Sequence, residues 1–381
     1  MLTALEESDS LKIGTVGPTF PPAENLVKQP TKNEELGYDS IWFPDHLMGW
    51  WPQSIWTPEI VEISAMQPSP HIFMETMVSM AIAAHSTEEI SVGSSVTEVF
   101  RRHPAMLAQS IVTIDHISQG RTILGIGAGE GENIVPYGME FSKPVSRLEE
   151  ALEILDILWS SEQGKTIDYD GEFWSLENAV FDLPLYNGER PSIWLGAHGP
   201  RMLELTAEYG DGWLPTEMSP DDYGEKLTYI REMMEEKSRD PSEMEAGLYA
   251  RIVIGDDEEE CLKIMDTIPL KAQCLAAPSE LFEEVGAFHP LGKGTYGLTE
   301  YIPSKLSKEE AIEAAESVPL DVAKKMYMYG TVEDIIDKID EYRAKGLEHI
   351  VFWNLTFFGD VDKLRSSYKK IGRIINHYKG E

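Results

Sequence analysis

The chain has few basic residues, few cysteines and no long hydrophobic run. Its 381 residues include 32 Lys and Arg against 66 Asp and Glu, which gives a formal net charge of −34. A surface this acidic repels nucleic acid and anionic membranes, so we expect neither as a partner. No apolar run approaches the roughly 18 residues that a membrane-spanning helix needs, and we predict no membrane segment.

Cysteine is equally scarce. Cys261 and Cys274 are the two in the chain, and neither lies near a cluster of Cys and His. This placement argues against a zinc site and against a disulfide framework, and it is typical of a reducing cytoplasm. The acidic segment 1–9 lacks the basic start of a signal peptide. We therefore expect a cytoplasmic protein and no metal site.

The excess of acidic residues has two interpretations. Acidic surfaces suit solubility at high ionic strength, where salt screens self-repulsion. We hypothesise a salt-adapted, archaeal-type cytoplasm. An ordinary acidic enzyme is the alternative and would have the same composition.

Short apolar segments alternate with amphipathic helical patterns along most of the chain. Strands rich in Val, Ile and Leu that are separated by helices indicate a parallel sheet covered on both faces. Eight such units indicate an α/β fold of the closed (β/α)8 TIM barrel type rather than an open sheet. Helices are predicted, among other places, at 105–117, 146–159, 323–328 and 331–345. The predicted strands are 11–17, 38–43, 89–96, 121–129, 191–196, 211–214, 248–254 and 349–353.

We expect one barrel domain over residues 1–381, with three insertions. Residues 45–70 form a loop rich in Trp and Pro after the second strand. Residues 165–185 are typical of a β-hairpin. Residues 267–319 have weak periodicity and many Pro and Gly, and we place them after the seventh strand, where barrel enzymes cover their substrates. The Trp residues of 42–56 either pack a loop core or line a substrate cage.

The segment Ile41-Trp-Phe-Pro-Asp-His-Leu-Met-Gly-Trp50 is the most informative in the chain. Its apolar strand ends abruptly and delivers Asp45, His46 and Trp50 at its carboxyl end. In a barrel of this type that end carries the chemistry. A lone strand-end His is structural about as often as it is functional. Five other histidines lack this context and are weaker candidates: His71, His85, His103, His116 and His289.

The fourth strand ends in the glycine-rich run Gly125-Ile-Gly-Ala-Gly-Glu-Gly-Glu-Asn133. Glycines allow a ligand to approach the backbone closely. The spacing is GxGxG rather than the GxGxxG dinucleotide fingerprint, so we exclude a Rossmann site. Glu130 is instead expected at the carboxyl face of the barrel, with Asn133 one turn further on. The alternative is that Glu130 and Glu132 are solvated loop acids.

Two more strand ends have features of an anion site. The segment 195–201, Leu-Gly-Ala-His-Gly-Pro-Arg, ends the fifth strand and begins a helix, whose free backbone N–H groups suit a phosphate. A tight turn without a ligand is the alternative there. Ser94–Thr97 closes the third strand, and Arg101-Arg-His-Pro104 follows it. We place the anionic tail of a cofactor near this basic cluster, although a surface ion-pair network would give the same pattern.

These strand ends together resemble the bacterial luciferase-like superfamily, in the branch that uses the deazaflavin coenzyme F420. The resemblance covers nearly the whole chain, and it is greatest to the phthiodiolone ketoreductase-like and methylene-tetrahydromethanopterin reductase-like enzymes. The F420-dependent secondary alcohol and glucose-6-phosphate dehydrogenases are similar but more distant. The motifs that carry it are Asp45-His-Leu-Met-Gly-Trp50, Gly93-Ser-Ser-Val96, Gly127-Ala-Gly-Glu-Gly-Glu-Asn133 and Gly210-Asp-Gly-Trp-Leu-Pro215.

The resemblance implies roles for individual residues. His46 matches the active-site His of the family, Trp50 the Trp four residues on, and Glu130 the Glu after the fourth strand. Ser95-Val96 matches a non-prolyl cis peptide bond behind the cofactor ring. Residue 98 is Glu in this chain, whereas related dehydrogenases have Thr there. The contacts that those enzymes make at the edge of the cofactor ring are therefore not assigned to this chain. The implied cofactor-binding residues are Asp45, Ser95, Val96, Thr97, Gly129, Asn133, Gly196, Ala197, His198 and Gly199.

The resemblance implies that the protein is an F420-dependent oxidoreductase. A hydride would move between C5 of the deazaflavin and a carbonyl or alcohol carbon of a small-molecule substrate, with His46 as proton donor or acceptor. Glu130 would handle charge or a proton at the pyrimidine end, and Trp50 would limit water. The alternatives are a methylene-tetrahydromethanopterin reductase, an FMN-dependent luciferase-like monooxygenase and a non-catalytic binder of a flavin-like ligand. By analogy the family implies a homodimer or homotetramer.

The salt hypothesis predicts that the melting temperature rises as salt is added, because screening weakens repulsion among the acidic side chains. Thermal unfolding followed by circular dichroism, at low and at molar salt, measures this. A melting temperature that is indifferent to salt would count against adaptation and favour the ordinary acidic enzyme.

Overall fold

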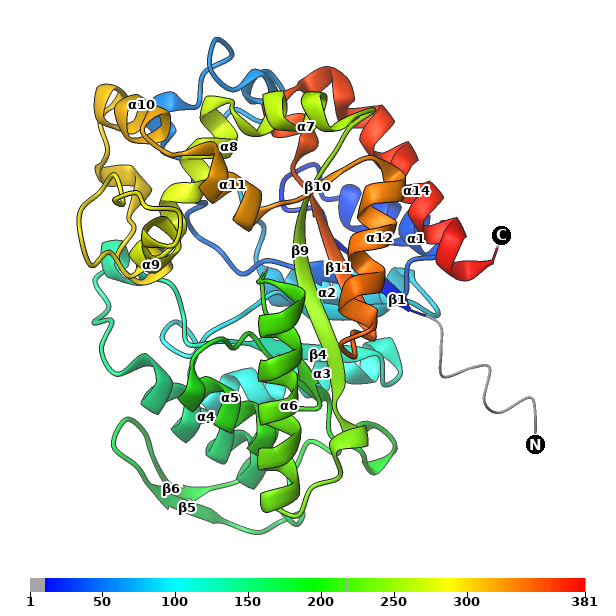
Figure 1. The fold of residues 1–381 in the computed structure, drawn as a ribbon. Helices are drawn as coiled ribbons and strands as arrows, with labels where there is room; N and C mark the ends of the chain where they lie inside the picture. Colours follow the sequence, from blue (N-terminus) through cyan, green and yellow to red (C-terminus); the bar gives the residue numbers. More distant parts are fainter. Residues whose placement is uncertain (1–10, 217, 381) are drawn as a thin grey trace.

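A closed barrel of parallel strands lies at the centre of the computed structural model, which describes residues 11–216 and 218–380 (Figure 1). Successive barrel strands pair in chain order, and the pairing of β9 with both β8 and β11 closes the ring. The predicted TIM barrel is confirmed, and each predicted strand has its counterpart. The barrel strands are β1 (Lys12–Val16), β2 (Ser40–Phe43), β3 (Ser91–Ser94), β4 (Thr122–Ile126), β7 (Ser192–Leu195), β8 (Gly212–Trp213), β9 (Glu245–Ile254) and β11 (His349–Asn354).

Helices cover the outside of the barrel. Strands β2 and β4 are buried along their whole length, because helices pack on one face and the barrel interior on the other. Among the described residues, no helix is both long and apolar enough to cross a membrane. The covering helices are α1 (Asn25–Glu35), α2 (Thr76–Ser86), α3 (Pro104–Ser118), α4 (Pro144–Trp159), α5 (Pro200–Tyr209), α6 (Pro220–Glu236), α12 (Val332–Arg343) and α14 (Leu364–Lys379).

Large aromatic side chains fill the barrel interior. The rings of Trp42 and Trp194 lie with their centroids 5.3 Å apart. Glycines on neighbouring strands make the space for them: a Cβ on Gly93 would lie 2.6 Å from the Trp42 ring, and one on Gly212 would lie 2.2 Å from the Trp194 ring. The interior is therefore a packed core rather than a pore, as is usual for this fold.

One helix prediction is wrong at its carboxyl end. The helix expected at 323–328 is α11 (Leu320–Met326), and Met328 already begins a strand, β10 (Met328–Gly330). Strand β10 pairs in parallel with the carboxyl end of β9, outside the closed ring. The run from Met326 to Tyr329 is apolar throughout, so its periodicity does not separate the end of a helix from the start of a strand.

The segments expected as insertions lie at two ends of the molecule in Figure 1. Strands β5 (Ile167–Asp170) and β6 (Ser175–Ala179) form an antiparallel hairpin at the bottom of that view. The loop 45–70 contains the 3-10 helices η1 (Gln53–Ile55) and η2 (Glu62–Ala65), and lies near the top with the helices that follow β9. Those helices are α7 (Glu258–Met265), α8 (Ile268–Gln273), α9 (Ser279–Glu283) and α10 (Lys308–Glu316), with α13 (Thr356–Gly359) after β11.

A second hydrophobic core joins the loop 45–70 to the segment after β9. Trp51 stacks on Phe358 with ring centroids 4.7 Å apart, and its Nε1 donates to the carbonyl of Pro269 at 2.8 Å. Trp56 donates to the carbonyl of Gln67 at 2.6 Å. These tryptophans therefore build a loop core, the first of the two possibilities above. Trp51 and Trp56 also border the cavity described next.

Candidate active site

A cavity of about 1100 Å³ lies at the carboxyl ends of the barrel strands. Its walls come from the segments after β2, β3, β4 and β7 and from the segment after β9. Ordinary ligand pockets measure about 300–1,000 Å³, so this one has room for a cofactor and a substrate together. The three catalytic candidates, His46, Trp50 and Glu130, all border it.

Most of the expected cofactor-binding residues border the same cavity. Ala197 is the exception, because it is 1% exposed and lies behind the wall, where its carbonyl accepts a hydrogen bond from Trp213 Nε1 at 2.9 Å. The residues of that set that do line the cavity are Asp45, Ser95, Val96, Thr97, Gly129, Asn133, Gly196, His198 and Gly199.

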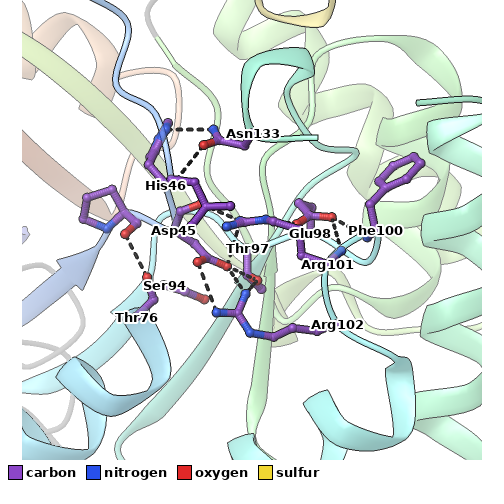
Figure 2. A network of polar contacts seen from close by, with 12 residues as sticks. Asp45, His46, Thr76, Ser94, Thr97, Glu98, Phe100, Arg101, Arg102 and Asn133 are labelled. Atoms are coloured by element: carbon purple, nitrogen blue, oxygen red, sulfur yellow. Dashed lines mark hydrogen bonds and ion pairs between the residues drawn. The ribbon is translucent and has the colours of Figure 1, made fainter. Parts of the chain in front are cut away.

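The amide of Asn133 joins the loop after β2 to the loop after β4 (Figure 2). Its Oδ1 accepts hydrogen bonds from the backbone N–H of Leu47 at 2.7 Å and of Met48 at 3.0 Å. Its Nδ2 lies 2.9 Å from Nδ1 of His46. Asn133 is 2% exposed, so water cannot replace these contacts, and the amide fixes where the His46 ring stands.

Nδ1 of His46 has two possible partners. Because Oδ1 of Asn133 accepts two backbone N–H groups, its Nδ2 faces His46 and can donate to an unprotonated Nδ1. The carbonyl of Met48 lies 3.1 Å from Nδ1 and can accept from it when Nδ1 carries hydrogen. The 2.9 Å contact with Nδ2 is the shorter of the two, and on that ground we assign the ring hydrogen to Nε2. Nε2 has no hydrogen-bond partner among the described residues, and it is the nitrogen left for a ligand in the cavity.

Two glutamates and a tryptophan surround Nδ1 of His46. Trp50 Nε1 donates to Glu132 Oε1 at 3.0 Å and lies 3.3 Å from Glu130 Oε2. The same two oxygens lie 3.9 and 3.7 Å from Nδ1 of His46. Burial raises the pKa of Glu132 well above its ordinary value, and the charge of Glu130 and a hydrogen bond with it raise that pKa further. Burial and the neighbouring charge thus both favour the protonated form of Glu132.

The stability contribution of Glu132 has a definite sign. Its pKa is raised in the folded protein, so its contribution to the free energy of unfolding is full below the ordinary carboxyl pKa. It is lost as pH rises towards the folded pKa. A buried acid of this kind opposes folding at alkaline pH, which makes a purely structural role for it costly.

The donor atoms of His46, Glu130 and Glu132 lie within 4.8 Å of one another, which is close enough for three ligands of one metal ion. The N–H groups of Trp50 and Asn133 point at the same carboxylate oxygens. These N–H groups already use lone pairs of the oxygens that a metal ion would need.

Asp45 is held by protein groups rather than left for a ligand (Figure 2). Its carboxylate accepts from the Thr97 hydroxyl at 2.6 Å and pairs with Arg101 and Arg102. Burial opposes its charge, but the two guanidinium groups and Thr97 hold the pKa of Asp45 below its ordinary value. Glu98 pairs with Arg101 in turn. The basic cluster thus forms an internal ion-pair network, the alternative given above to a site for an anionic tail.

Val96, Gly127 and Gly196 form another part of the cavity wall. The Ser95–Val96 peptide bond is cis, as the resemblance implies. Val96 packs between two glycines: a Cβ on Gly127 would lie 2.9 Å from Val96 Cγ2, and one on Gly196 would lie 3.5 Å away. Glycine at both positions therefore keeps the wall level, which suits the face of a planar ring.

The segment Gly196–Gly199 leads into helix α5, whose first residue is Pro200. Gly199 caps this helix without a side-chain hydrogen bond, and no acidic residue lies in the first turn. A Cβ on Gly199 would meet nothing within 4 Å, so the approach is open. The exposed N–H groups and the helix dipole make this end of α5 suitable for a phosphate.

The fold and this site define a class of protein. Residues 6–349 match the model of the luciferase-like monooxygenase family, and the chain belongs to that family. The phthiodiolone/phenolphthiodiolone dimycocerosates ketoreductase of Mycobacterium bovis is 34% identical over 349 residues, which are 91% of this chain and 90% of that protein. The 5,10-methylenetetrahydromethanopterin reductase of Archaeoglobus fulgidus is 29% identical over 272 residues, 71% of this chain and 79% of that protein.

Among solved structures, an F420-dependent secondary alcohol dehydrogenase in complex with an F420-acetone adduct superimposes with a TM-score of 0.71. The match covers 93% of this chain and 97% of that one, at 20% sequence identity. At this identity the likeness shows a shared fold. The resemblance stated from the motifs is confirmed by these comparisons.

The sequence did not single out Glu132. It stands two residues from Glu130 in a glycine-rich loop, a context in which a solvated acid is the usual interpretation. In the structure Glu132 is 0% exposed, while the Glu130 side chain is 25% exposed. No local signal marks this difference. A distant part of the chain packs against this loop, because the carbonyl of Thr299 lies 2.3 Å from where a Cβ of Gly131 would be.

The hydrogen bonding of Asn133 predicts the effect of Asn133→Asp. One carboxylate oxygen would still accept from Leu47 and Met48, but the other would face Nδ1 of His46 and accept. We expect the proton of His46 to move to Nδ1. Nitrogen-15 NMR of histidine-labelled protein reports the tautomer directly.

Asn187→Asp is the matched control, because it adds the same charge at an exposed residue. It should leave the ring with hydrogen on Nε2. An Nδ1–H signal in the wild-type protein would contradict the assignment made above.

Proposed function

We propose that the protein is an F420-dependent oxidoreductase that transfers a hydride between C5 of the deazaflavin and a carbonyl or alcohol carbon. The observation that carries the proposal is His46, whose Nδ1 is held by Asn133 while Nε2–H is left for the cavity. A ring nitrogen that can deliver or take a proton there is what reduction of a carbonyl requires.

The cavity has the shape that such a cofactor needs. The level wall of Val96, Gly127 and Gly196 suits the planar ring, and the amino end of α5 suits an anionic tail. When bound, the reduced deazaflavin supplies a hydride from C5. The residues that would hold it are Ser95, Val96, Thr97, Gly129, Asn133, Gly196, His198 and Gly199. Asp45 would contribute indirectly, because its carboxylate is taken up by Thr97 and the two arginines.

Each of the three candidate catalytic residues has a separate task in this proposal. His46 donates its Nε2 proton to the oxygen of the substrate carbonyl as negative charge develops there, or accepts it in the reverse direction. Trp50 contacts the His46 ring edge to face, with centroids 5.3 Å apart, and keeps water from that side. Glu130, the more exposed of the two acids, exchanges charge or protons with the cavity.

A large apolar ketone is the substrate class that the lining favours. The apolar residues of the cavity lining include Phe73, Leu281, Leu298, Met326 and Phe357. A ketoreductase stands among the relatives with 34% identity, which supports a carbonyl substrate. The reductase of Archaeoglobus fulgidus supports a pterin substrate as the second candidate with the same cofactor. The FMN-dependent monooxygenase alternative is supported by the family name, and a Baeyer-Villiger monooxygenase in complex with FMN is among the solved structures that share the fold.

The proposal extends to the cellular setting. We infer a cytoplasmic enzyme that acts on a small molecule as a homodimer or homotetramer. Neither nucleic acid nor a membrane is expected as a partner, because the net charge of −34 repels both.

The proposal predicts that F420 binds and FMN does not. Titration of the purified protein with each cofactor at the same salt, followed by quenching of cofactor fluorescence, measures both affinities. Tight F420 binding justifies a screen of ketones, alcohols and pterins. FMN binding without F420 binding would contradict the proposal and move the protein to the oxygenases.

Within the same experiment, His46→Ala should keep F420 affinity and lower kcat by about 10²–10⁴-fold, the usual contribution of a general acid or base. His85→Ala, an exposed histidine on α2, is the control and should leave both unchanged. Unchanged turnover in His46→Ala with F420 bound would show that the assignment to His46 is wrong.

A further inference from the structure

Glu132 is a buried acid that the proposed function does not yet use. Its carboxyl group is 0% exposed, and no N–H donor among the described residues reaches its Oε2. Oε1 accepts from Trp50 and Asn133, at 3.0 and 3.1 Å. A buried carboxyl oxygen without a donor is expensive unless it carries or shares a proton. Its nearest acidic neighbour, Glu130, is close enough to hydrogen-bond with it.

A proton balance shows what the site lacks. In the arrangement assigned above, the His46 ring carries hydrogen on Nε2 and none on Nδ1. If Nε2 gave up its only proton, the ring would become an anion, which no group nearby stabilises. The ring can act as an acid at neutral pH only if another proton reaches Nδ1 as the first one leaves Nε2. The protein must therefore hold a proton close to Nδ1.

We propose that Glu132 and Glu130 together hold one proton, and that this proton passes to Nδ1 of His46 as the Nε2 proton is delivered to the substrate. This inference rests on the proposed function. Glu132 acts through His46 and does not touch the substrate, so it is a positioning residue, and what it positions is a proton.

The proposed step conserves atoms and electrons. The carbonyl carbon receives a hydride from the reduced deazaflavin, and the carbonyl π electrons move to the oxygen. That oxygen takes the proton from Nε2, whose bonding electrons stay on the ring. The lone pair of Nδ1 binds the proton that leaves the glutamate pair. The ring is then left with hydrogen on Nδ1 and none on Nε2. Nε2, which is left for the cavity, takes a proton from solvent, and Nδ1 returns its proton to the glutamate pair, which restores the starting state.

The geometry around Nδ1 suits this exchange. The two glutamate oxygens lie 3.7 and 3.9 Å from Nδ1, a gap that a small rotation or one water molecule closes. Once protonated, Nδ1 can donate to the carbonyl of Met48, which lies 3.1 Å away. The Nδ2 hydrogens of Asn133 then turn to Glu132 and Glu130, at 3.1 and 3.4 Å. Nδ1 of His46 and Nδ2 of Asn133 therefore have hydrogen-bond partners both before and after the proton transfer.

The burial of Glu132 explains why two acids are needed. Glu130 borders the cavity and has solvent to stabilise its charge, whereas Glu132 has none. Burial and the charge of Glu130 both favour the protonated form of Glu132. Other titratable or charged groups near Glu132 are Tyr137, Tyr301 and His46, while Arg251 lies 5.3 Å from the ring of Trp50. Tyr301 is engaged by the carbonyl of Trp50 at 2.9 Å.

The first test reads the proton itself in the protein without cofactor. A protonated carboxylic acid has an infrared carbonyl band that a carboxylate lacks. We expect this band in the wild-type protein at neutral pH and its loss in Glu132→Gln. Glu150→Gln is the matched control, because Glu150 is also buried but lies on α4, where its carboxylate accepts from the N–H of Phe173 and Trp174 in the β5–β6 hairpin. A wild-type protein without the band would overturn the inference.

The second test uses turnover with reduced F420 and a long-chain aliphatic methyl ketone. Glu132→Gln keeps the acceptor for Trp50 and Asn133 but has no acid proton. We expect kcat to fall at least about 10-fold with KM unchanged. The alkaline limb of the wild-type pH profile, where the pair loses its proton, should disappear. A purely structural role would instead lower the melting temperature and leave the shape of the profile intact, which would overturn the inference.

Two controls separate this inference from the function on which it rests. If the wild-type protein fails to bind F420, the proposed function fails, while the infrared band still decides whether the proton is present. If Zn²⁺ alone binds stoichiometrically to the wild-type protein and not to Glu132→Gln, the cluster is a metal site and the proton inference is wrong. We expect no such difference, because Trp50 and Asn133 direct N–H groups at the same oxygens.

Discussion

The amide of Asn133 is the constraint on which the rest of the site depends. One oxygen accepts two backbone N–H groups of the β2 loop, and one nitrogen reaches His46 and both glutamates of the β4 loop. Neighbouring strands of a parallel barrel bring their carboxyl ends together, but they do not fix how loop side chains face one another. This buried amide does so, and its contact with Nδ1 is the basis for the tautomer assigned to His46.

The second constraint is that the site is covered by a distant part of the chain. The loop 45–70 and the segment after β9 share a hydrophobic core, and the carbonyl of Thr299 occupies the space that a side chain at residue 131 would need. Glycine at 131 is therefore what permits the cover to close on Glu132. The packing energy of that core offsets the cost of a buried acid, which links the insertion to the chemistry.

Much of the fold could be predicted from the sequence, because barrel strands that are buried on both faces read as continuous apolar runs. The residues at the ends of β2 and β4 were also predictable, since motifs at strand ends keep their spacing. The burial of Glu132 was not, because it depends on tertiary contact with Thr299. The partners of Arg101 and Arg102 were not either, since an ion-pair network and an anion site have the same local sequence. Strand β10 was missed because the run from Met326 to Tyr329 is apolar throughout. Such a run is compatible with the hydrophobic period of a helix and with that of a strand.

The central claim is that this histidine and glutamate cluster serves hydride transfer from a deazaflavin to a carbonyl. Its most direct test uses reduced F420 that carries deuterium at C5, with a long-chain aliphatic methyl ketone, and mass spectrometry of the product. The account predicts an alcohol with a single deuterium on the carbon that bears the hydroxyl group. An alcohol without deuterium, or a product that has gained oxygen instead, would contradict it.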